Sequence, residues 1–248
     1  MPTLPQPECP TILNAKAVAE FTQKEERRDY IGASLIGHPC ARHIWYRYHG
    51  YPSEPFDAET LWRFADGHRT EALVIERLRQ VPGVQIWNEG PDGKQLGFRT
   101  LGGKFGGSVD GIIKGLVQAP KTTHVLEVKC VGEKGFAEFK KLVFEYGEKR
   151  ALEQWNATYY AQAQVYMRYF NLNRHYLVVA LAGGRDMAAC RTEFNPEYAE
   201  RLVDKAERIL QATSEPARVS EKADYYICKW CPFKEICHGK KENSPTGE

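Results

Sequence analysis

Several features that define whole classes of protein are missing from this chain of 248 residues. No apolar run is long enough to span a membrane, and the Pro-rich start MPTLPQPECP lacks the apolar stretch of a signal peptide. We therefore expect a cytoplasmic protein with no membrane partner. The formal net charge is only +2, which leaves room for local basic patches but excludes a wholly basic surface. No internal repeat is present, and no G-x-x-x-x-G-K-[ST] loop, which excludes an ATP motor of that kind.

The chain does contain enough apolar material for one large domain, because 42% of its residues are hydrophobic and 12% are aromatic. Hydrophobic periodicity predicts helices over 11–28, 39–49, 59–80, 134–147, 150–170 and 195–213, and strands over 84–89, 95–105, 106–114, 123–131, 174–182 and 187–194. This order predicts a mixed α/β fold with one central sheet. The expected divisions are a disordered leader 1–10, an N-terminal helical segment 11–58, a core 59–194, a C-terminal helix with a cysteine knuckle 195–238, and a disordered tail 239–248.

Four cysteines form the first candidate site. Cys228, Cys231 and Cys237 make a C-x2-C-x5-C run near the end, and Cys40 opens an aromatic, basic segment near the beginning. Disulfides are rare in a reducing compartment, whereas four thiolates satisfy a structural Zn²⁺ ion or an iron–sulfur cluster. Such a site would join the two ends of the chain. Three histidines are alternatives to one of the thiolates: His38, His43 and His238.

Charged residues inside apolar strands form the second candidate site. Alternate side chains of the expected strand 123–131 point to opposite faces, so Glu127 and Lys129 share one face. Asp110 stands in another strand-like run, GGSVDGII, and with Glu127 it could bind one Mg²⁺ ion through oxygen. Lys129 would then orient or deprotonate a water molecule. The alternative is a simple ion pair on the strand, with Asp110 in a turn.

Two expected helices carry further candidates. His68 and Glu71 are three residues apart and can face the same way, so either could complete a metal site or remain a solvated surface group. Gln162 and Tyr166 are four residues apart in an aromatic stripe that we expect to be core. A buried glutamine needs a partner, and a lysine or a phosphate would serve.

Basic residues alternate with aromatic ones after Cys40, where Arg42 and Arg47 flank Trp45 and Tyr46. This mixture suits single-stranded DNA, through phosphate contacts and base stacking. The alternative is a helix that packs its aromatic side on the core. Two further basic candidates follow the strand 123–131: Lys134 and Lys140.

Taken together, these residues resemble the PD-(D/E)XK nuclease superfamily, in particular its RecB-like and lambda-exonuclease-like branches, over roughly residues 59–182. The resemblance implies a restriction-endonuclease-like core, which is a central mixed sheet flanked by helices. The family pattern of an acid on the first helix, then D, E-x-K and Q-x-x-x-Y maps onto Glu71, Asp110, Glu127-Val128-Lys129, and Gln162 with Tyr166.

The cysteine pattern is similar to that of iron–sulfur nucleases of the AddB type and of the CRISPR-adaptation type. That resemblance implies a [4Fe–4S] cluster on Cys40, Cys228, Cys231 and Cys237 that pins the ends of the chain around the core, with structural Zn²⁺ as the alternative. Iron–sulfur members usually carry a histidine at the first-helix metal position. This chain has Glu71 there, as in the lambda-type branch, so Glu71 is favoured over His68 as the ligand.

The resemblance implies a metal-dependent DNA exonuclease, a hydrolase that acts at DNA ends or on single strands. Asp110, Glu127, Glu71 and the Val128 carbonyl would hold Mg²⁺ or Mn²⁺, Lys129 would assist the water, and Gln162 and Tyr166 would position the lysine or the phosphate. The alternative is a catalytically inactive iron–sulfur or zinc protein that binds DNA or acts as a scaffold. A zinc-dependent transcription regulator is a weaker alternative. A recombination or helicase partner, and a homo-oligomer, are compatible with the exonuclease and with the scaffold protein.

Overall fold

The computed structural model describes residues 9–22 and 28–239. Most of the expected leader and of the expected tail therefore lies outside the described residues. Pro10, assigned to the leader, instead begins α1 (Pro10–Phe21), and proline is well suited to a first helical position. The expected helix over 11–28 ends at Phe21 in the described part.

The larger of two sheets has five strands in the order β2-β5-β6-β7-β8, with β6 and β7 parallel and the other neighbours antiparallel. Its strands are β2 (Gln85–Trp87), β5 (Gly111–Lys114), β6 (His124–Val131), β7 (Arg174–Leu181) and β8 (Met187–Glu193). The smaller sheet has the order β1-β4-β3, built from β1 (Ile31–Gly32), β4 (Phe105–Ser108) and β3 (Gly97–Thr100). The mixed α/β expectation is confirmed, but the expectation of one central sheet is wrong.

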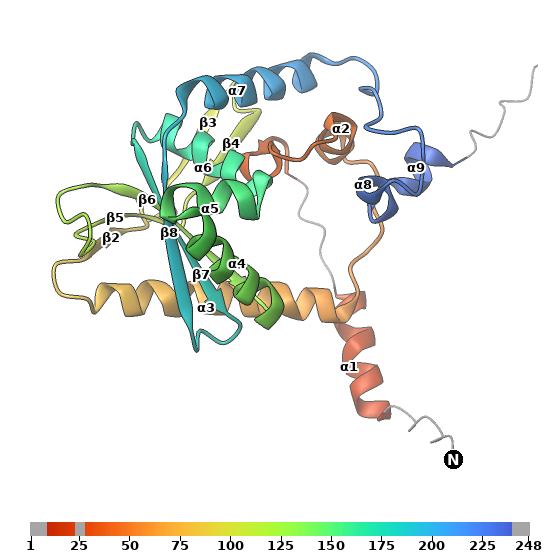
Figure 1. Cartoon of the computed structure of the whole chain (residues 1–248). Helices are drawn as coiled ribbons and strands as arrows, with labels where there is room; N and C mark the ends of the chain where they lie inside the picture. The colour runs from red at the N-terminus through yellow and green to blue at the C-terminus, as the bar shows by residue number, and fades with distance from the viewer. Residues whose placement is uncertain (1–8, 23–27, 240–248) are drawn as a thin grey trace, which may run out of the picture.

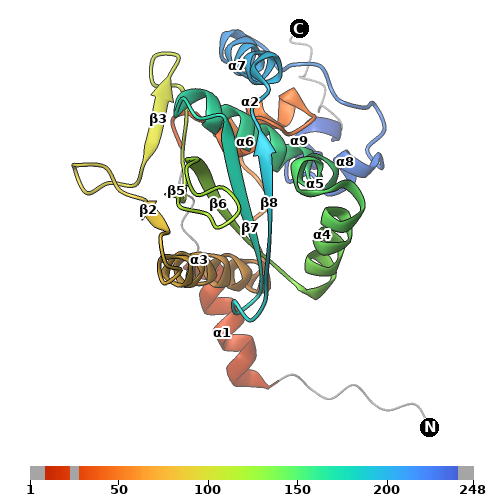
Figure 2. The same cartoon turned by 60° about the vertical axis from the view of Figure 1, so that its left-hand side comes forward.

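Helices cover both faces of the five-stranded sheet. On one face, Val74 and Ile75 of α3 pack on Leu126 and Val128 of β6. On the other face lie three helices whose buried side chains meet those of β7 and β8. Figures 1 and 2 show α3 and the α4–α5 pair on opposite sides of the strands. These helices are α3 (Ala58–Arg79), α4 (Glu133–Tyr146), α5 (Glu148–Trp155) and α6 (Ala157–Tyr169).

Two expected elements are divided in the structure. The expected strand 106–114 is two strands, β4 and β5, which belong to different sheets and part at Val109 and Asp110. The expected helix 150–170 is interrupted at Asn156, whose side chain accepts hydrogen bonds from the backbone N–H groups of Thr158 and Tyr159 and so caps α6. Both divisions place polar residues at the start of an element that contributes to the site below.

Segments from the two ends of the chain lie side by side, as Figure 1 shows. Trp45 donates a hydrogen bond from Nε1 to the carbonyl of Ala212 at 3.1 Å, and the Glu54 N–H bonds the Pro232 carbonyl at 3.3 Å. The helices involved are α2 (Ala41–His49), α7 (Pro196–Gln211), α8 (Tyr226–Lys229) and α9 (Lys234–His238), together with the short 3₁₀ helix η1 (Ala33–Leu35). Within the described ranges, no helix is both long enough and apolar enough to cross a bilayer.

Candidate active site

The site begins where β5 and β6 part. The ladder between these strands pairs Gly111 with Leu126 and goes no further toward Val128. Asp110, the residue just before β5, takes up the next position with its side chain, because its Oδ2 accepts a hydrogen bond from the Val128 N–H at 2.7 Å. The end of the ladder therefore fixes one carboxylate beside the backbone of β6.

Glu127 and Lys129 share the face of β6 that α6 covers, as the strand alternation predicts. Lys129 Nζ donates a hydrogen bond to Glu127 Oε1. Gln162 of α6 donates to the same oxygen from Nε2 at 3.0 Å. Glu127 is only 3% exposed, so a buried carboxylate is held from two sides.

Tyr166 extends this network to β4. Its hydroxyl donates a hydrogen bond to the Ser108 carbonyl at 2.7 Å and accepts one from Gln162 Nε2 at 3.2 Å. The ring needs a glycine beside it, because a Cβ on Gly107 would lie 2.8 Å from the Tyr166 ring. Gln162 and Tyr166 are thus held together as one pair, and the expected partner of the buried glutamine is Glu127.

The electrostatics show that the acids lie close together. Burial raises the pKa of Asp110 well above its usual range, and the neighbouring Glu127 charge raises it further. Burial and then Glu127 also raise the pKa of Glu71, which lies on the facing helix α3. Burial lowers the pKa of Lys129, but Glu127 and Asp110 outweigh that effect and leave the pKa above its usual value. Asp110 and Glu71 therefore both have raised pKa values, and a positive charge placed near them would favour their ionised forms.

The carboxylates offer the donor chemistry of a hard cation. Glu127 Oε2 is buried and has no hydrogen-bond partner, although Oε1 has two. A divalent ion would satisfy such an oxygen, and carboxylate oxygens are the ligands that Mg²⁺ and Mn²⁺ prefer. As arranged, no three His, Cys, Asp or Glu side chains form a group that could hold a metal ion in the described part of the chain. The residues thus fit the ion in kind, although they do not form a ligand group as arranged.

The remaining expected metal and DNA contacts are His68, Lys134 and Lys140. His68 is exposed on α3, and its charge lowers the pKa of Glu71, so the two are neighbours. Lys134 is exposed in the first turn of α4, and Lys140 forms an ion pair with Asp186 at 3.5 Å.

Tyr159 is a neighbour of Lys129 that we did not identify as part of the site from the sequence. Lys129 Nζ lies 5.1 Å from the centre of its ring, in a cation–π contact.

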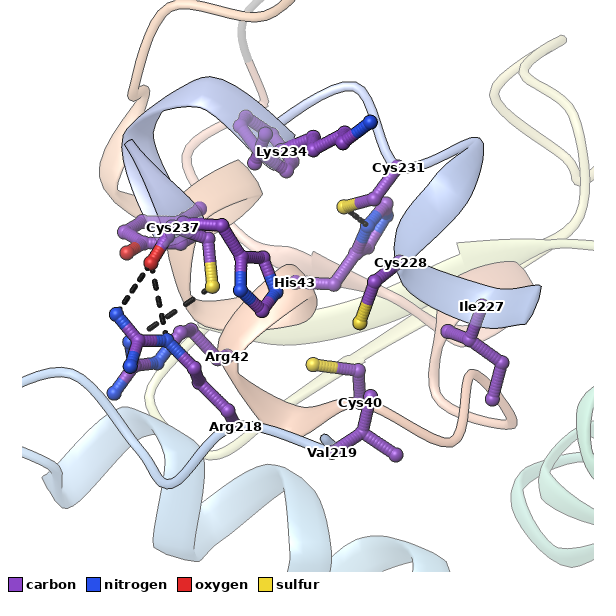
Figure 3. A pocket seen from close by; sticks show the side chains of 13 residues that line it. Cys40, Arg42, His43, Arg218, Val219, Ile227, Cys228, Cys231, Lys234 and Cys237 are labelled. Atoms are coloured by element: carbon purple, nitrogen blue, oxygen red, sulfur yellow. Dashed lines mark hydrogen bonds between the residues drawn. The ribbon is translucent and has the colours of Figure 1, made fainter. Parts of the chain in front are cut away.

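The four cysteines line a separate pocket between the two ends of the chain. Cys40, Cys228, Cys231 and Cys237 all contribute to its wall, and Figure 3 shows their side chains gathered around it. Burial raises the pKa values of Cys228 and Cys231, and the charges of Cys40 and Cys237 raise both further. Cys40 and Cys237 thus lie close enough to Cys228 and Cys231 to act on them electrostatically. Four thiols are the donor set of a Zn²⁺ ion or an iron–sulfur cluster in kind, although these four, like the carboxylates, do not form a metal-holding group as arranged in the described residues.

Basic groups surround the cysteine pocket. Arg42 Nη1 lies 3.8 Å from Cys237 Sγ, and Arg218 Nε donates to the Cys237 carbonyl at 3.0 Å. His43 Nδ1 is 3.5 Å from Cys231 Sγ, and burial followed by the nearby His38 lowers the pKa of His43 to about 3. The two arginines lie where they would offset the negative charge of thiolates in this pocket.

Arg42 does not present an exposed basic group to DNA, as we had expected from the sequence. Its Nε donates to the Pro216 carbonyl at 2.6 Å, its Nη1 pairs with Glu215 at 3.3 Å, and only 12% of its side chain is exposed. Trp45 and Tyr46 are buried in the core. The packing alternative therefore describes most of this segment, whereas Arg47 is exposed.

Comparison with known proteins supports the fold. No protein-family model matches the chain, and no curated protein matches it. Among solved structures, it is similar to the alkaline exonuclease LHK-Exo from Laribacter hongkongensis, with a TM-score of 0.52, 14% identity, and coverage of 74% of this chain and 87% of that one. The same exonuclease in complex with dAMP gives a TM-score of 0.51 at 16% identity with the same coverage. The chain therefore has an exonuclease-like fold.

Proposed function

We propose that this protein is a divalent-metal-dependent deoxyribonuclease, an exonuclease that acts in the cytoplasm at DNA ends or on single strands. One observation carries the proposal. In an exonuclease-like fold, Lys129 and Gln162 both bond Oε1 of the buried Glu127, whose Oε2 has no partner, and Asp110 is fixed beside the same strand. The structural neighbour that holds dAMP shows that a related fold accommodates a nucleotide.

The cation would be held by the carboxylates of Asp110, Glu127 and Glu71 and by the Val128 carbonyl. When bound, Mg²⁺ or Mn²⁺ lowers the pKa of a water molecule and offsets charge on a phosphate oxygen. His68, exposed beside Glu71, is the reserve ligand on α3. The buried, unpartnered oxygen of Glu127 is what fits this role, because such an atom is costly without a ligand.

The chain's own residues then organise hydrolysis. Lys129 would orient the water or take up its proton, and would offset negative charge on the phosphate. Gln162 and Tyr166 hold Glu127 and β4 in place. The water oxygen forms the new bond to phosphorus as the bond to the leaving oxygen breaks, giving a phosphate monoester and a hydroxyl group.

The cysteine pocket has a structural role in this proposal. Cys40, Cys228, Cys231 and Cys237 would hold a [4Fe–4S] cluster, or Zn²⁺, between the two ends of the chain. Arg42 and Arg218 beside Cys237 would balance the charge of four thiolates. The occupant would not take part in hydrolysis.

A degradation assay tests the proposal. End-labelled DNA is incubated with the purified protein in Mn²⁺ or in EDTA, and product length is followed on a gel. We expect degradation from the ends in Mn²⁺, none in EDTA, and a loss of at least about 100-fold for Lys129→Ala, because removing one charge-stabilising donor costs about 10²–10³ in rate. The control is Lys121→Ala, an exposed lysine outside the site. Binding of DNA with no metal-dependent loss of substrate would support a scaffold and refute the enzyme.

A further inference from the structure

A second cavity lies beside the candidate active site and has a mixed basic and aromatic lining. It is bounded by the β1–η1 segment, α2, the connection that follows α2 and the first half of α3. Arg28 and Arg47 line it together with the rings of Tyr48, Phe56 and Phe64. Among the described residues that line it, Glu54 supplies the single carboxylate. Basic groups next to aromatic rings are the combination that binds a nucleic-acid strand through phosphates and bases.

Two of the rings form a platform at this cavity. Phe56 and Phe64 meet edge to face with their centroids 5.1 Å apart. Phe56 is 37% exposed and Phe64 is 49% exposed. Single exposed apolar residues are common on proteins, and Phe144, which is 91% exposed on α4, is one of them. The Phe56–Phe64 pair differs because it lines a cavity that two arginines, Arg28 and Arg47, also line.

Helix α3 connects this cavity to the candidate active site. Leu61, Phe64, His68 and Glu71 follow at steps of three, four and three residues, so they lie along one face of α3. Phe64 and Glu71 are seven residues apart, which is about 10 Å along a helix. That distance corresponds to about three nucleotides at the spacing of about 3.4 Å along one strand.

The inner wall of the cavity is adjacent to the candidate active site. Gly32, Ser34 and Leu35 line the cavity, and Ala33 stands among them. A Cβ on Gly107 would lie 3.0 Å from Ala33 Cβ and 2.8 Å from the Tyr166 ring, so Ala33 and Tyr166 lie against the same backbone position of β4. The charge of Arg28 also lowers the pKa of Tyr166, against the larger effect of burial. The cavity and the network around Glu127 are thus adjacent.

We propose that this cavity binds an unpaired segment of DNA next to the bond to be cut, with bases stacked on Phe64 and Phe56 and phosphates held by Arg28 and Arg47. The proposal deepens the proposed function and rests on it for the orientation of the strand. In a duplex each base is stacked between its neighbours and paired, so its face is not available to a phenylalanine ring. The preferred substrate is therefore a single strand or a single-stranded tail.

Binding is measured in EDTA, where the proposed hydrolysis is absent. Fluorescence anisotropy compares a labelled 12-nucleotide single strand, a blunt duplex of the same sequence, and that duplex with a single-stranded tail. We expect the single strand and the tailed duplex to bind more tightly than the blunt duplex. Phe64→Ala should weaken single-strand binding about 5- to 100-fold, because one stacked base is worth about 1–3 kcal/mol, and should change blunt-duplex binding less than about twofold.

Matched variants separate stacking from packing. Phe64→Leu keeps an apolar side chain without a ring, so it should lose affinity as Phe64→Ala does while its melting temperature stays near that of the wild type. Phe144→Ala, on α4, should bind like the wild type. Equal losses for single strand and duplex, no loss for Phe64→Leu, or the same loss for Phe144→Ala would each overturn the proposal.

The arginines are tested by salt dependence. Arg47→Gln should reduce the slope of log K against log salt for the single strand by about one, since it removes one phosphate contact. Arg201→Gln is the control, because this exposed arginine lies on α7, away from α3 in Figure 1. An unchanged slope for Arg47→Gln would contradict its role. DNA degraded in Mn²⁺ without single-strand preference would refute the cavity proposal alone, whereas Phe64-dependent binding without degradation would refute the nuclease alone.

Discussion

Glu127 is the residue on which the candidate active site converges. A carboxylate that is 3% exposed needs compensation, and it receives one ammonium group and one amide at the same oxygen. The other oxygen has no hydrogen-bond partner. In the proposed site, the protein positions one oxygen and the cation would bind the other.

The first prediction concerns the amide that holds Glu127. Gln162→Leu removes the hydrogen bonds to Glu127 Oε1 and to the Tyr166 hydroxyl. A hydrogen bond to a charged group is worth about 1.5–3 kcal/mol, so we expect the rate of DNA degradation in Mn²⁺ to fall about 10- to 100-fold. The rate is measured per folded molecule, with circular dichroism giving the folded fraction.

Gln164→Leu is the matched control for that prediction. Gln164 is also a buried glutamine of α6, and it donates to the Glu193 carbonyl and accepts from the Asn195 N–H, away from the site. This variant should lower stability but keep the rate per folded molecule. If both variants lose activity equally, Gln162 has only a structural role.

The second prediction concerns a buried histidine. His175 of β7 is 1% exposed, its Nδ1 has no hydrogen-bond partner, and burial, followed by the nearby charge of Lys129, lowers its pKa to about 3. In the unfolded chain the same group titrates near its ordinary value of about 6.5. Between these two values the unfolded state binds a proton that the folded state does not. The free energy of unfolding therefore falls as the pH is lowered through this window, by about 1.4 kcal/mol per pH unit.

His175→Leu should remove that part of the pH dependence. Urea unfolding at pH 6.5 and pH 5.5 should show a loss of stability that is about 1 kcal/mol smaller for the variant than for the wild type. His49→Gln is the control, because this histidine is exposed. Identical pH dependence in wild type and His175→Leu would show that the imidazole is protonated in the folded state.

At the scale of the element, the parting of β4, β5 and β6 positions the acids. The sequence predicted Asp110 and Glu127 on neighbouring strands, and the pairing of β5 with β6 matches that prediction. The predicted strand 106–114 nevertheless missed the break at Val109, because an apolar, glycine-rich run is compatible with one strand or two. Only the pairing of Gly111 with Leu126, a long-range contact, determines where the ladder ends.

Helix α3 and Arg42 show that the sequence predicted where helices lie better than it predicted which side chains are exposed. Helical periodicity predicted α3 nearly to its ends, since the expected helix 59–80 is Ala58–Arg79 in the structure. Periodicity gives the face of a helix but not what covers it, and Phe64 is half exposed. For Arg42 the error was the reverse, because a basic residue beside aromatic ones was expected at the surface and instead bonds Glu215 and Pro216.

The third prediction concerns the contact between the N-terminal segment and α6. A Cβ on Gly37 would lie 2.6 Å from the Thr158 Cα and 2.7 Å from the Ala161 Cβ, both of which belong to the helix that carries Gln162. Gly37→Ala should therefore lower the free energy of unfolding by about 1–3 kcal/mol, the usual cost of overpacking. Urea denaturation measures the change.

Gly67→Ala is the matched control for Gly37→Ala, and it should change the free energy of unfolding in the opposite direction. Gly67 lies within α3, and a Cβ there meets nothing within 4 Å. Alanine is favoured over glycine in a helix by about 1 kcal/mol, so this variant should be more stable than the wild type. If both alanines destabilise equally, the close approach at Gly37 does not hold η1 against α6.

At the scale of the whole molecule, the two ends of the chain meet at the cysteine pocket. Cys40 precedes α2, and its partners come about 190 residues later, a separation at which a cross-link removes much loop entropy from the unfolded chain. The sequence and its resemblance predicted one site for these four residues, and all four line one pocket, while a shared metal or cluster stays a prediction. They were not sufficient to predict that Arg42 and Arg218 surround Cys237, because neither residue belongs to the spacing pattern.

The last prediction is that the occupant of this pocket stabilises the whole fold through both ends. Cys40→Ser and Cys228→Ser, one ligand from each end, should each lose bound iron or zinc, measured per chain by mass spectrometry on anaerobically purified protein. Each should also lower Tm by about 5–10 °C, because loss of about 2–3 kcal/mol shifts Tm by about 2–4 °C per kcal/mol at this size. Cys130→Ser, which changes a half-buried thiol outside the pocket, should retain both the metal and the wild-type Tm.

Broad visible absorption that disappears only in the two pocket variants would identify iron and sulfide, and a colourless wild type with one zinc per chain would identify zinc. Full metal content in Cys40→Ser would mean that the C-terminal cysteines bind alone and that the two ends are held together only by contacts such as Trp45 with Ala212.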